Sequence, residues 1–100
     1  MKKYSLNVVA KIKDKNEHLL FFIEDCFTHC VESRWGNSEI YESESCLSIH
    51  CKWSYDKADL AEEDYACLSQ KVSEMKLANI VSQDSRVSLS SKETNVVNHS

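Results

Sequence analysis

The first third of the chain changes from an alternating to a helical pattern of apolar side chains. Apolar residues take every second position in the opening segment, namely Tyr4, Leu6, Val8, Ala10 and Ile12. A period of two predicts a half-buried strand. From Glu17 to about Ser33 the apolar residues recur every three or four positions, which predicts an amphipathic helix. We expect Asn16 to cap this helix and Gly36 to follow it in a left-handed conformation.

The middle of the chain predicts a hairpin and then a second helix. Residues 38–53 form two arms around a turn at residues 43–45, and the second arm points Leu47, Ile49, Cys51 and Trp53 inward. The second helix is expected to open at Asp56, with acidic residues in its first turns, where the helix dipole favours them. Its apolar stripe consists of Ala61, Tyr65, Leu68, Val72 and Met75.

Ile80–Val81 and Arg86–Leu89 are expected to supply one last strand, and the polar residues 90–100 predict a flexible tail. The chain is therefore expected to form a single α+β domain over residues 1–89. The predicted order is β-α-β-β-α-β, with two helices on one face of an antiparallel sheet. This is the split βαβ order of ferredoxin-like folds, which host many unrelated functions. The expected core unites the apolar stripes: Leu6, Val8, Ile23, Leu47, Ile49, Cys51, Leu68 and Val72.

The composition bears on compartment and chemistry. Gly36 is the only glycine and there is no proline, so the glycine-rich fingerprints of nucleotide sites are absent. We therefore expect a protein that is not an enzyme. The apolar run Leu19–Ile23 is too short for a membrane span, and Lys11 and Lys13 interrupt any signal peptide. The five cysteines are an odd number, and reduced thiols in a cytoplasm are expected.

The net charge of −4 is unevenly distributed. Residues 1–13 hold four lysines and no acid, whereas residues 14–64 hold thirteen acidic residues against four basic ones. An acidic surface repels phosphate backbones and anionic membranes and attracts basic partners. The outer sheet face is expected to show some bases, namely Lys11, Lys13, His50 and Lys52. It lacks the aromatic pattern of RNA-binding sheets, so we expect neither nucleic acid nor a membrane as a partner.

Cysteines and histidines form two similar clusters, Cys26-x-x-His29-Cys30 and Cys46-x-x-x-His50-Cys51. Zinc binds Cys and His in fours, so the candidate ligands are Cys26, Cys30, Cys46, His50 and Cys51. Free cysteine is also a common small core residue, and we expect core cysteines with no bound metal or cofactor. Cys46 and His50 lie about 13 Å apart along one strand face, too far apart for a nucleophile and its base.

The remaining hypothesis is protein binding through an acidic surface. Tyrosine and tryptophan are favoured interface anchors, and several lie among the acids of the hairpin and the second helix. The expected partner-binding residues are Trp35, Glu39, Tyr41, Glu42, Glu44, Tyr55, Glu62, Glu63 and Asp64. We expect them to form one continuous negative face.

In size, charge and compartment the chain is similar to bacterial immunity proteins and to phage anti-CRISPR and anti-restriction inhibitors, without sharing a motif with them. The resemblance implies an inhibitor that occludes a basic site on a larger protein, such as a nucleic-acid-binding enzyme or complex. Two alternatives stay open. One is a metal- or thiol-dependent regulatory domain, and the other is a structural accessory subunit.

Overall fold

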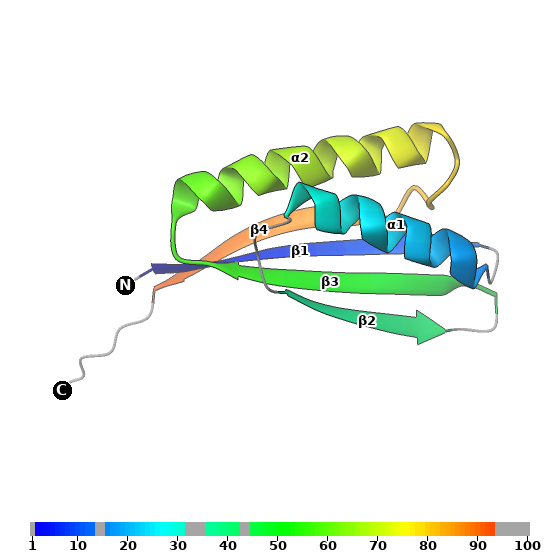
Figure 1. The fold of residues 1–100 in the computed structure, drawn as a ribbon, viewed down its shortest axis with the longest axis horizontal. Coiled ribbons are helices and arrows are strands. Elements are labelled where there is room, and N and C mark those ends of the chain that lie inside the picture. Colours follow the sequence, from blue (N-terminus) through cyan, green and yellow to red (C-terminus); the bar gives the residue numbers. More distant parts are fainter. Residues whose placement is uncertain (1, 14–15, 32–35, 43–44, 94–100) are drawn as a thin grey trace.

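Four strands and two helices account for most of the chain in the computed structural model, which describes residues 2–13, 16–31, 36–42 and 45–93. In chain order they are β1 (Lys2–Ile12), α1 (Glu17–Cys30), β2 (Gly36–Glu42), β3 (Leu47–Tyr55), α2 (Ala58–Leu77) and β4 (Arg86–Glu93). Figure 1 shows the two helices lying along the same face of the sheet. The predicted α+β class and the order β-α-β-β-α-β are confirmed.

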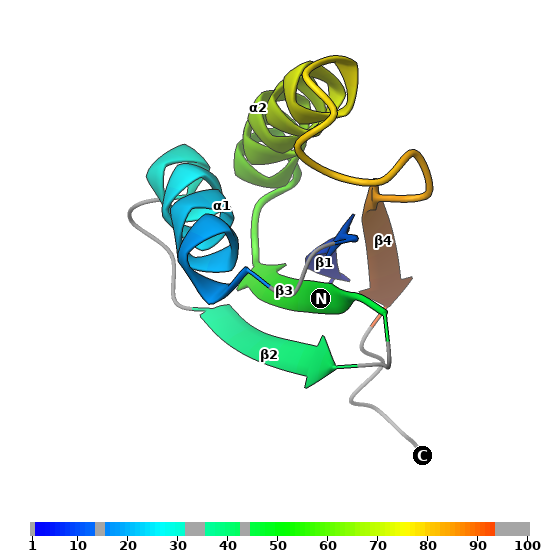
Figure 2. The ribbon, with the colours of Figure 1, turned by 90° about the vertical axis from the view of Figure 1, so that its right-hand side faces the viewer.

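The sheet is antiparallel throughout and has the strand order β2-β3-β1-β4. β1 is central and pairs with β3 on one side and β4 on the other, so β2 and β4 are the edges. This is the arrangement of a ferredoxin-like fold. Figure 2 shows both helices on one side of the sheet, with the other side uncovered.

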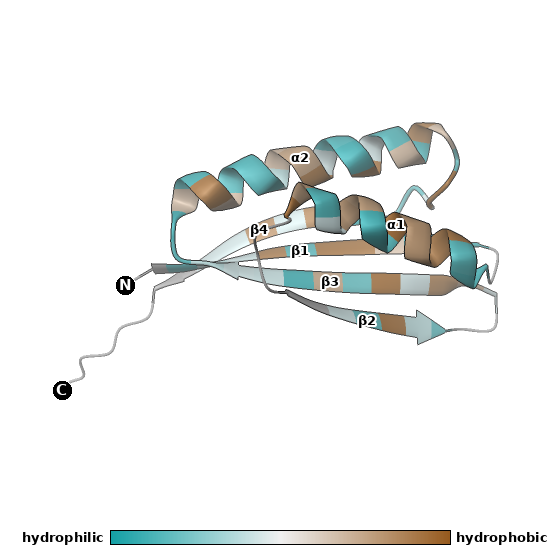
Figure 3. Cartoon of the chain, in the orientation of Figure 1, coloured by the Kyte–Doolittle hydropathy of each residue, from teal (hydrophilic) through white to brown (hydrophobic). Residues whose placement is uncertain are grey.

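The core fills the space between the sheet and the helices. Residues directly opposite one another on paired strands share a face, and the register places Val8 beside Cys51 and Ala10 beside Ile49. Apolar and polar residues alternate along β3 (Figure 3), so one face of this strand is buried. All eight residues of the expected core are buried, which confirms the predicted registers.

Helix α1 begins as predicted but is rotated relative to the predicted stripe. The Asn16 side chain accepts a hydrogen bond from the Leu19 N–H at 3.2 Å and caps the helix. The buried residues are Leu20, Ile23 and Phe27, followed by Val31. Cys26 and Cys30, expected on the inner stripe, are half-buried at its flank. Phe21 and Phe22 are 54% and 55% exposed, so both rings lie outside the core.

Helix α2 starts at Ala58 rather than at Asp56, and Tyr65 is exposed instead of joining the buried stripe. The end of the helix explains the turn that follows. Asn79 has a φ of 58°, and the Ile80 N–H donates to the Met75 carbonyl at 2.8 Å. This is a Schellman cap with asparagine in the left-handed position. The prediction for Gly36 was wrong: Gly36 begins β2 and has no positive φ.

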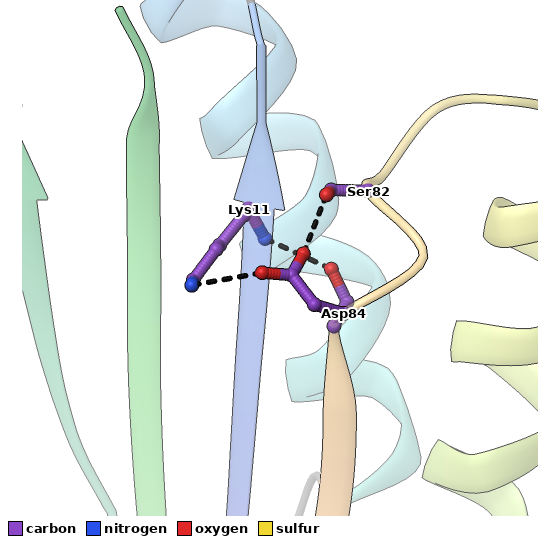
Figure 4. A network of polar contacts seen from close by, with 4 residues as sticks. Lys11, Ser82 and Asp84 are labelled. Carbon is purple, nitrogen blue, oxygen red and sulfur yellow. Dashed lines mark hydrogen bonds and ion pairs between the residues drawn. The ribbon is translucent and has the colours of Figure 1, made fainter.

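A polar network attaches the loop before β4 to the end of β1. The Lys11 N–H donates to the Ser85 hydroxyl at 3.0 Å, and the Ser82 N–H donates to the Lys11 carbonyl at 2.8 Å. Figure 4 shows the Lys11 ammonium on Asp84, at 2.9 Å, and the Ser82 hydroxyl on the same carboxylate. The loop therefore continues the pairing of β1 beyond Arg86, where the β4 ladder starts.

β4 continues to Glu93, four residues beyond the predicted strand end at Leu89. Residues 90–93 are therefore part of the sheet rather than of the predicted tail, because they pair with the first residues of β1. Residues 94–100 lie outside the described part of the chain.

Ile49→Ala should lower the free energy of unfolding by about 2–5 kcal/mol, because Ile49 is fully buried on β3 and its loss leaves a cavity. Ile40→Ala is the matched control. Ile40 pairs directly with Ile49 but is half exposed on β2, so its loss should cost less than about 1 kcal/mol. Urea denaturation of both variants measures the difference. Equal losses would contradict the register.

The Asp84 network should give the domain an acid-sensitive contribution to stability. The hydrogen bond from Ser82 and the contacts with Lys11 lower the pKa of Asp84 to about 2. Because the folded-state pKa lies below the ordinary value near 4, this contribution is complete above about pH 4 and is lost as the pH falls through 2. Thermal melts of Asp84→Asn should therefore show a smaller fall in Tm between pH 4 and pH 2 than melts of the parent.

Ser82→Ala should produce part of the same change, because it removes one hydrogen bond to the Asp84 carboxylate. Ser88 is an exposed serine on β4, and Ser88→Ala should show the same fall in Tm between pH 4 and pH 2 as the parent. If Tm of Asp84→Asn fell between pH 4 and pH 2 as much as that of the parent, the network would not contribute to stability in solution.

Candidate protein-binding surfaces

The acidic residues expected on one face occupy two separate regions. Glu42 pairs with Leu47 at one end of β3, whereas Asp64 contacts Tyr55 at the other end. Eight residue steps along a strand separate these ends by about 26 Å. Figure 1 shows β2 ending at the end of the sheet opposite to the start of α2. The predicted continuous negative face is therefore wrong, and the hairpin and helix acids form two distinct surfaces.

Tyr55 is a core residue rather than an exposed anchor. It is 3% exposed, and its hydroxyl donates to the Asp64 carboxylate at 2.6 Å. A buried phenol needs a hydrogen-bond partner, and Asp64 on the inner flank of α2 provides one. This contact attaches the end of β3 to the first turns of α2. The proposed partner-binding roles of Tyr55 and Asp64 are thus replaced by a structural one.

On α2, Glu62 and Glu63 are exposed, as expected of a solvated helix start. Two further predicted residues, Trp35 and Glu44, lie outside the described residues.

The acidic edge of the sheet consists of Glu39, Ile40, Tyr41 and Glu42, and all four side chains are exposed. Among the described strands, β2 pairs with β3 alone, so its other side presents backbone N–H and C=O groups along the edge. Ile40 and Glu42 oppose inward-facing residues of β3 and share the helix side of the sheet. Glu39 and Tyr41 lie on the uncovered side. A partner strand placed here would meet carboxylates and apolar groups on both of its faces.

The side chains on the uncovered side of this edge contact one another. The Tyr41 hydroxyl donates to the Glu39 carboxylate. This hydrogen bond and the negative charge of Glu39 raise the pKa of Tyr41 above its ordinary value. The Tyr41 ring also lies against the His50 ring, with centroids 4.5 Å apart and planes tilted by 60°. The tyrosine is therefore held in place beside a carboxylate while remaining 49% exposed.

The bases of the uncovered sheet face are partly neutralised by acids of the same domain. The Lys3 ammonium lies 2.7 Å from Asp56, and the Lys11 ammonium lies 2.9 Å from Asp84. Lys52 and Arg86 are exposed on β3 and β4. Both ion pairs join β1 to residues just outside neighbouring elements, and so help to hold these elements against β1.

The candidate zinc ligands are distributed over different parts of the fold. Cys51 faces the core and contacts the Ser38 hydroxyl at 3.5 Å, and burial raises the pKa of its thiol. His50 is exposed on the uncovered sheet face, and Cys46 is half-buried just before β3. In the described part of the chain, no three His, Cys, Asp or Glu side chains are grouped as a metal ion would require. None of the five cysteines, all of which lie in described segments, is in a disulfide.

One contact between thiols was missing from the sequence-based expectations. Cys67 lies on α2, which packs against α1, and its side chain raises the pKa of the Cys30 thiol on α1. The signal was available: Cys67 directly precedes the buried Leu68, so it lies beside the apolar stripe, on the flank shared with Asp64 and Lys71. Sequence alone does not show which neighbouring helix this flank faces.

A cavity of about 600 Å³ lies at the end of the sheet where α1 begins. Its apolar lining is Ile12, Leu19, Ile80 and Val81, and its polar lining is Lys13, Asn79, Ser82, Gln83 and Asp84. The Asp84 carboxylate on this rim already accepts bonds from Lys11 and Ser82. The Asp84 carboxylate therefore stabilises the loop before β4.

Comparisons with known proteins define the fold and leave function open. The chain matches no protein-family model and no curated protein sequence. It is similar in structure to the de novo designed protein Foldit4, with a TM-score of 0.60 and 12% identity over 93% of this chain and 99% of that one. It is also similar to part of an amidase of the hydantoinase/carbamoylase family from Burkholderia multivorans, with a TM-score of 0.52 and 7% identity.

The match to the amidase covers 92% of this chain but only 28% of that one. At these identities the likeness concerns the fold alone. A dimeric ferredoxin-like protein from an uncultured marine organism also matches, with a TM-score of 0.45 and 12% identity over 97% of this chain and 94% of that one. In the part of the chain that the structure describes, neither helix is long and apolar enough to cross a membrane.

Tyr55→Phe should lower the free energy of unfolding by roughly 1–3 kcal/mol, because it removes a hydrogen bond to a carboxylate in a partly buried site. Tyr41→Phe is the matched control, since it removes an exposed hydroxyl that also bonds a carboxylate, and it should cost under about 0.5 kcal/mol. Chemical denaturation of the two variants gives both values. An unchanged free energy of unfolding in Tyr55→Phe would show that this hydrogen bond does not stabilise the contact between β3 and α2.

Proposed function

We propose that the domain is a protein-binding module that captures a basic, extended segment of a larger protein along β2. The observation that carries the proposal is the acidic edge: an edge strand whose last four side chains are exposed and include two carboxylates, an isoleucine and a tyrosine. The hypothesis of protein binding is kept for the acids of the hairpin. For the acids of α2 we propose only that they keep the domain soluble.

The backbone of β2 supports this mode of binding. A strand added to a sheet edge gains main-chain hydrogen bonds, and its alternate side chains give specificity. On the helix side such a strand would meet Ile40 and Glu42, and on the uncovered side Glu39 and Tyr41. Lysine or arginine in the added strand would complement the two carboxylates. An acidic edge also disfavours pairing with β2 of a second copy, because like charges would then oppose one another.

The electrostatics favour a basic partner approached from a distance. Complementary charge raises association rates, and exposed aromatic residues slow dissociation. Tyr41 is suited to the second role, because its hydrogen bond to Glu39 and its contact with His50 reduce the ordering that binding would otherwise require.

The biological consequence that we propose is occlusion of a basic site on the partner, in the manner of immunity proteins and anti-defence inhibitors. The domain itself would carry out no catalysis. We place this activity in the cytoplasm, where five cysteines without disulfides are stable in the reduced form.

Two double charge reversals separate the two acidic surfaces. Glu39→Lys with Glu42→Lys changes the acidic edge, and Glu62→Lys with Glu63→Lys changes α2 by the same amount of charge. A partner recovered from native lysate at low salt by the parent should bind the edge variant with an on-rate at least about tenfold lower and the helix variant nearly as the parent. Surface plasmon resonance across a salt series measures both rates, and the on-rate of the parent should fall with salt.

Two further measurements make the test specific to the edge strand. Circular dichroism should show the parent fold in both variants, because exposed substitutions usually change stability by under about 0.5 kcal/mol. Amide hydrogen exchange of β2 should slow when the partner binds. Loss of binding in the helix variant alone, or unchanged exchange in β2, would refute binding along this edge.

A further inference from the structure

Two cysteines from different helices meet where α1 packs beside α2. Cys30 lies in the last turn of α1 and is half-buried, whereas Cys67 lies in the middle of α2 and is exposed. α1 packs against α2, and the Cys67 side chain acts on the Cys30 thiol and raises its pKa. Figure 2 shows the two helices side by side on the same face of the sheet. The two thiols therefore lie where the helices pack together, although 36 residues of the chain lie between them.

The position of Asp64 shows which flank of α2 faces α1. Asp64, Cys67 and Lys71 are spaced by three and four residues and so share one face of the helix. The charges of both Lys71 and Asp64 act on the Cys30 thiol. Asp64 also bonds Tyr55 of β3, the strand that α1 covers. Because α2 lies mainly over β1 and β4, a side chain of α2 that reaches β3 points toward α1, and the flank that carries Cys67 therefore faces α1.

We propose that Cys30 and Cys67 form a reversible disulfide that links α1 to α2 when the protein meets a peroxide. The inference is independent of the proposed binding function, because neither cysteine lies on β2. A site of this kind needs one accessible thiol, which reacts first, and a second thiol beside it, which completes the bond. Cys67 is accessible and Cys30 is sheltered, so the two thiols fit these two roles.

The reaction balances in two steps with hydrogen peroxide as the oxidant. The Cys67 sulfur attacks one peroxide oxygen, the O–O bond breaks, and water leaves with the thiol proton, so that Cys67 becomes a sulfenic acid. The Cys30 sulfur then attacks the Cys67 sulfur, the S–O bond breaks, and a second water leaves with the Cys30 proton. Two thiols and one peroxide thus give one disulfide and two waters. A dithiol reductant reverses the bond by thiol–disulfide exchange and is itself oxidised.

The surroundings favour this order of events. Burial and the hydrogen bond with Cys67 raise the pKa of the Cys30 thiol to about 12, which keeps Cys30 protonated and slow to react with peroxide. Oxidation of Cys67 removes the thiol partner that contributes to this shift. The nearby Lys71 ammonium lowers the pKa of Cys30 and so assists its deprotonation for the second step.

The test is peroxide treatment of the full chain, followed by mass spectrometry and thermal melts. A stoichiometric amount of hydrogen peroxide should remove two hydrogen atoms from the intact mass and link the tryptic peptide of residues 16–34 to that of residues 58–71. Because the new ring of residues 30–67 constrains the unfolded chain, Tm should rise by roughly 10 °C and return on addition of dithiothreitol.

Three serine variants assign the bond. The peptide of residues 16–34 contains both Cys26 and Cys30, so Cys26→Ser is the matched control and should oxidise as the parent does. Cys67→Ser, at an exposed position, should fold normally and lose both the linked peptide and the rise in Tm, and Cys30→Ser should leave Cys67 as a sulfenic or higher acid. A link that survives in Cys67→Ser, or peroxide that adds oxygen to the parent without forming a link, would overturn the proposal.

Discussion

The central strand β1 is the element on which the remainder of the domain depends. It pairs along most of its length with β3 on one side and β4 on the other. Its inward side chains Leu6, Val8 and Ala10 are fully buried beneath the helices. Beyond the end of the β1–β4 ladder at Val9, the N–H and C=O groups of Lys11 are both hydrogen-bonded to the loop before β4. Because β1 and β3 are the two inner strands, β2 and β4 are left as edges, and the acidic edge is a consequence of this topology.

Periodicity was sufficient to predict the elements and most of the core, because burial on one face of a strand or helix leaves a direct record in the sequence. The same rule would also have placed Tyr55 correctly. The inward series Leu47, Ile49, Cys51 and Trp53 continues by one more step to Tyr55, which is buried like its predecessors. The prediction of Tyr55 as a surface anchor was wrong because it relied on the neighbouring acids instead of on the alternation of the strand.

The errors at α1 and at the acidic surface have a different cause. The seven apolar residues of segment 19–27, Cys26 included, are compatible with more than one rotation of the helix, and packing against β3 and α2 selects Leu20, Ile23 and Phe27 for the core. Likewise, a count of charge along the chain does not distinguish an edge strand from a helix on the opposite half of the sheet. Which acids share a surface is decided by strand order, and strand order depends on contacts between residues far apart in sequence.

The thiol pair and the acidic edge are connected through the chain itself. A disulfide between Cys30 and Cys67 would close a covalent ring that contains all of β2 and β3. Among the described strands β2 has β3 as its one neighbour in the sheet, so an opening of the domain that releases α1 from α2 would also loosen the segment that holds β2. Closing the ring restricts such openings, because it limits how far the helices can separate. An edge held more firmly loses less freedom when a partner strand pairs with it, so oxidation would strengthen binding by preorganisation rather than by any new contact.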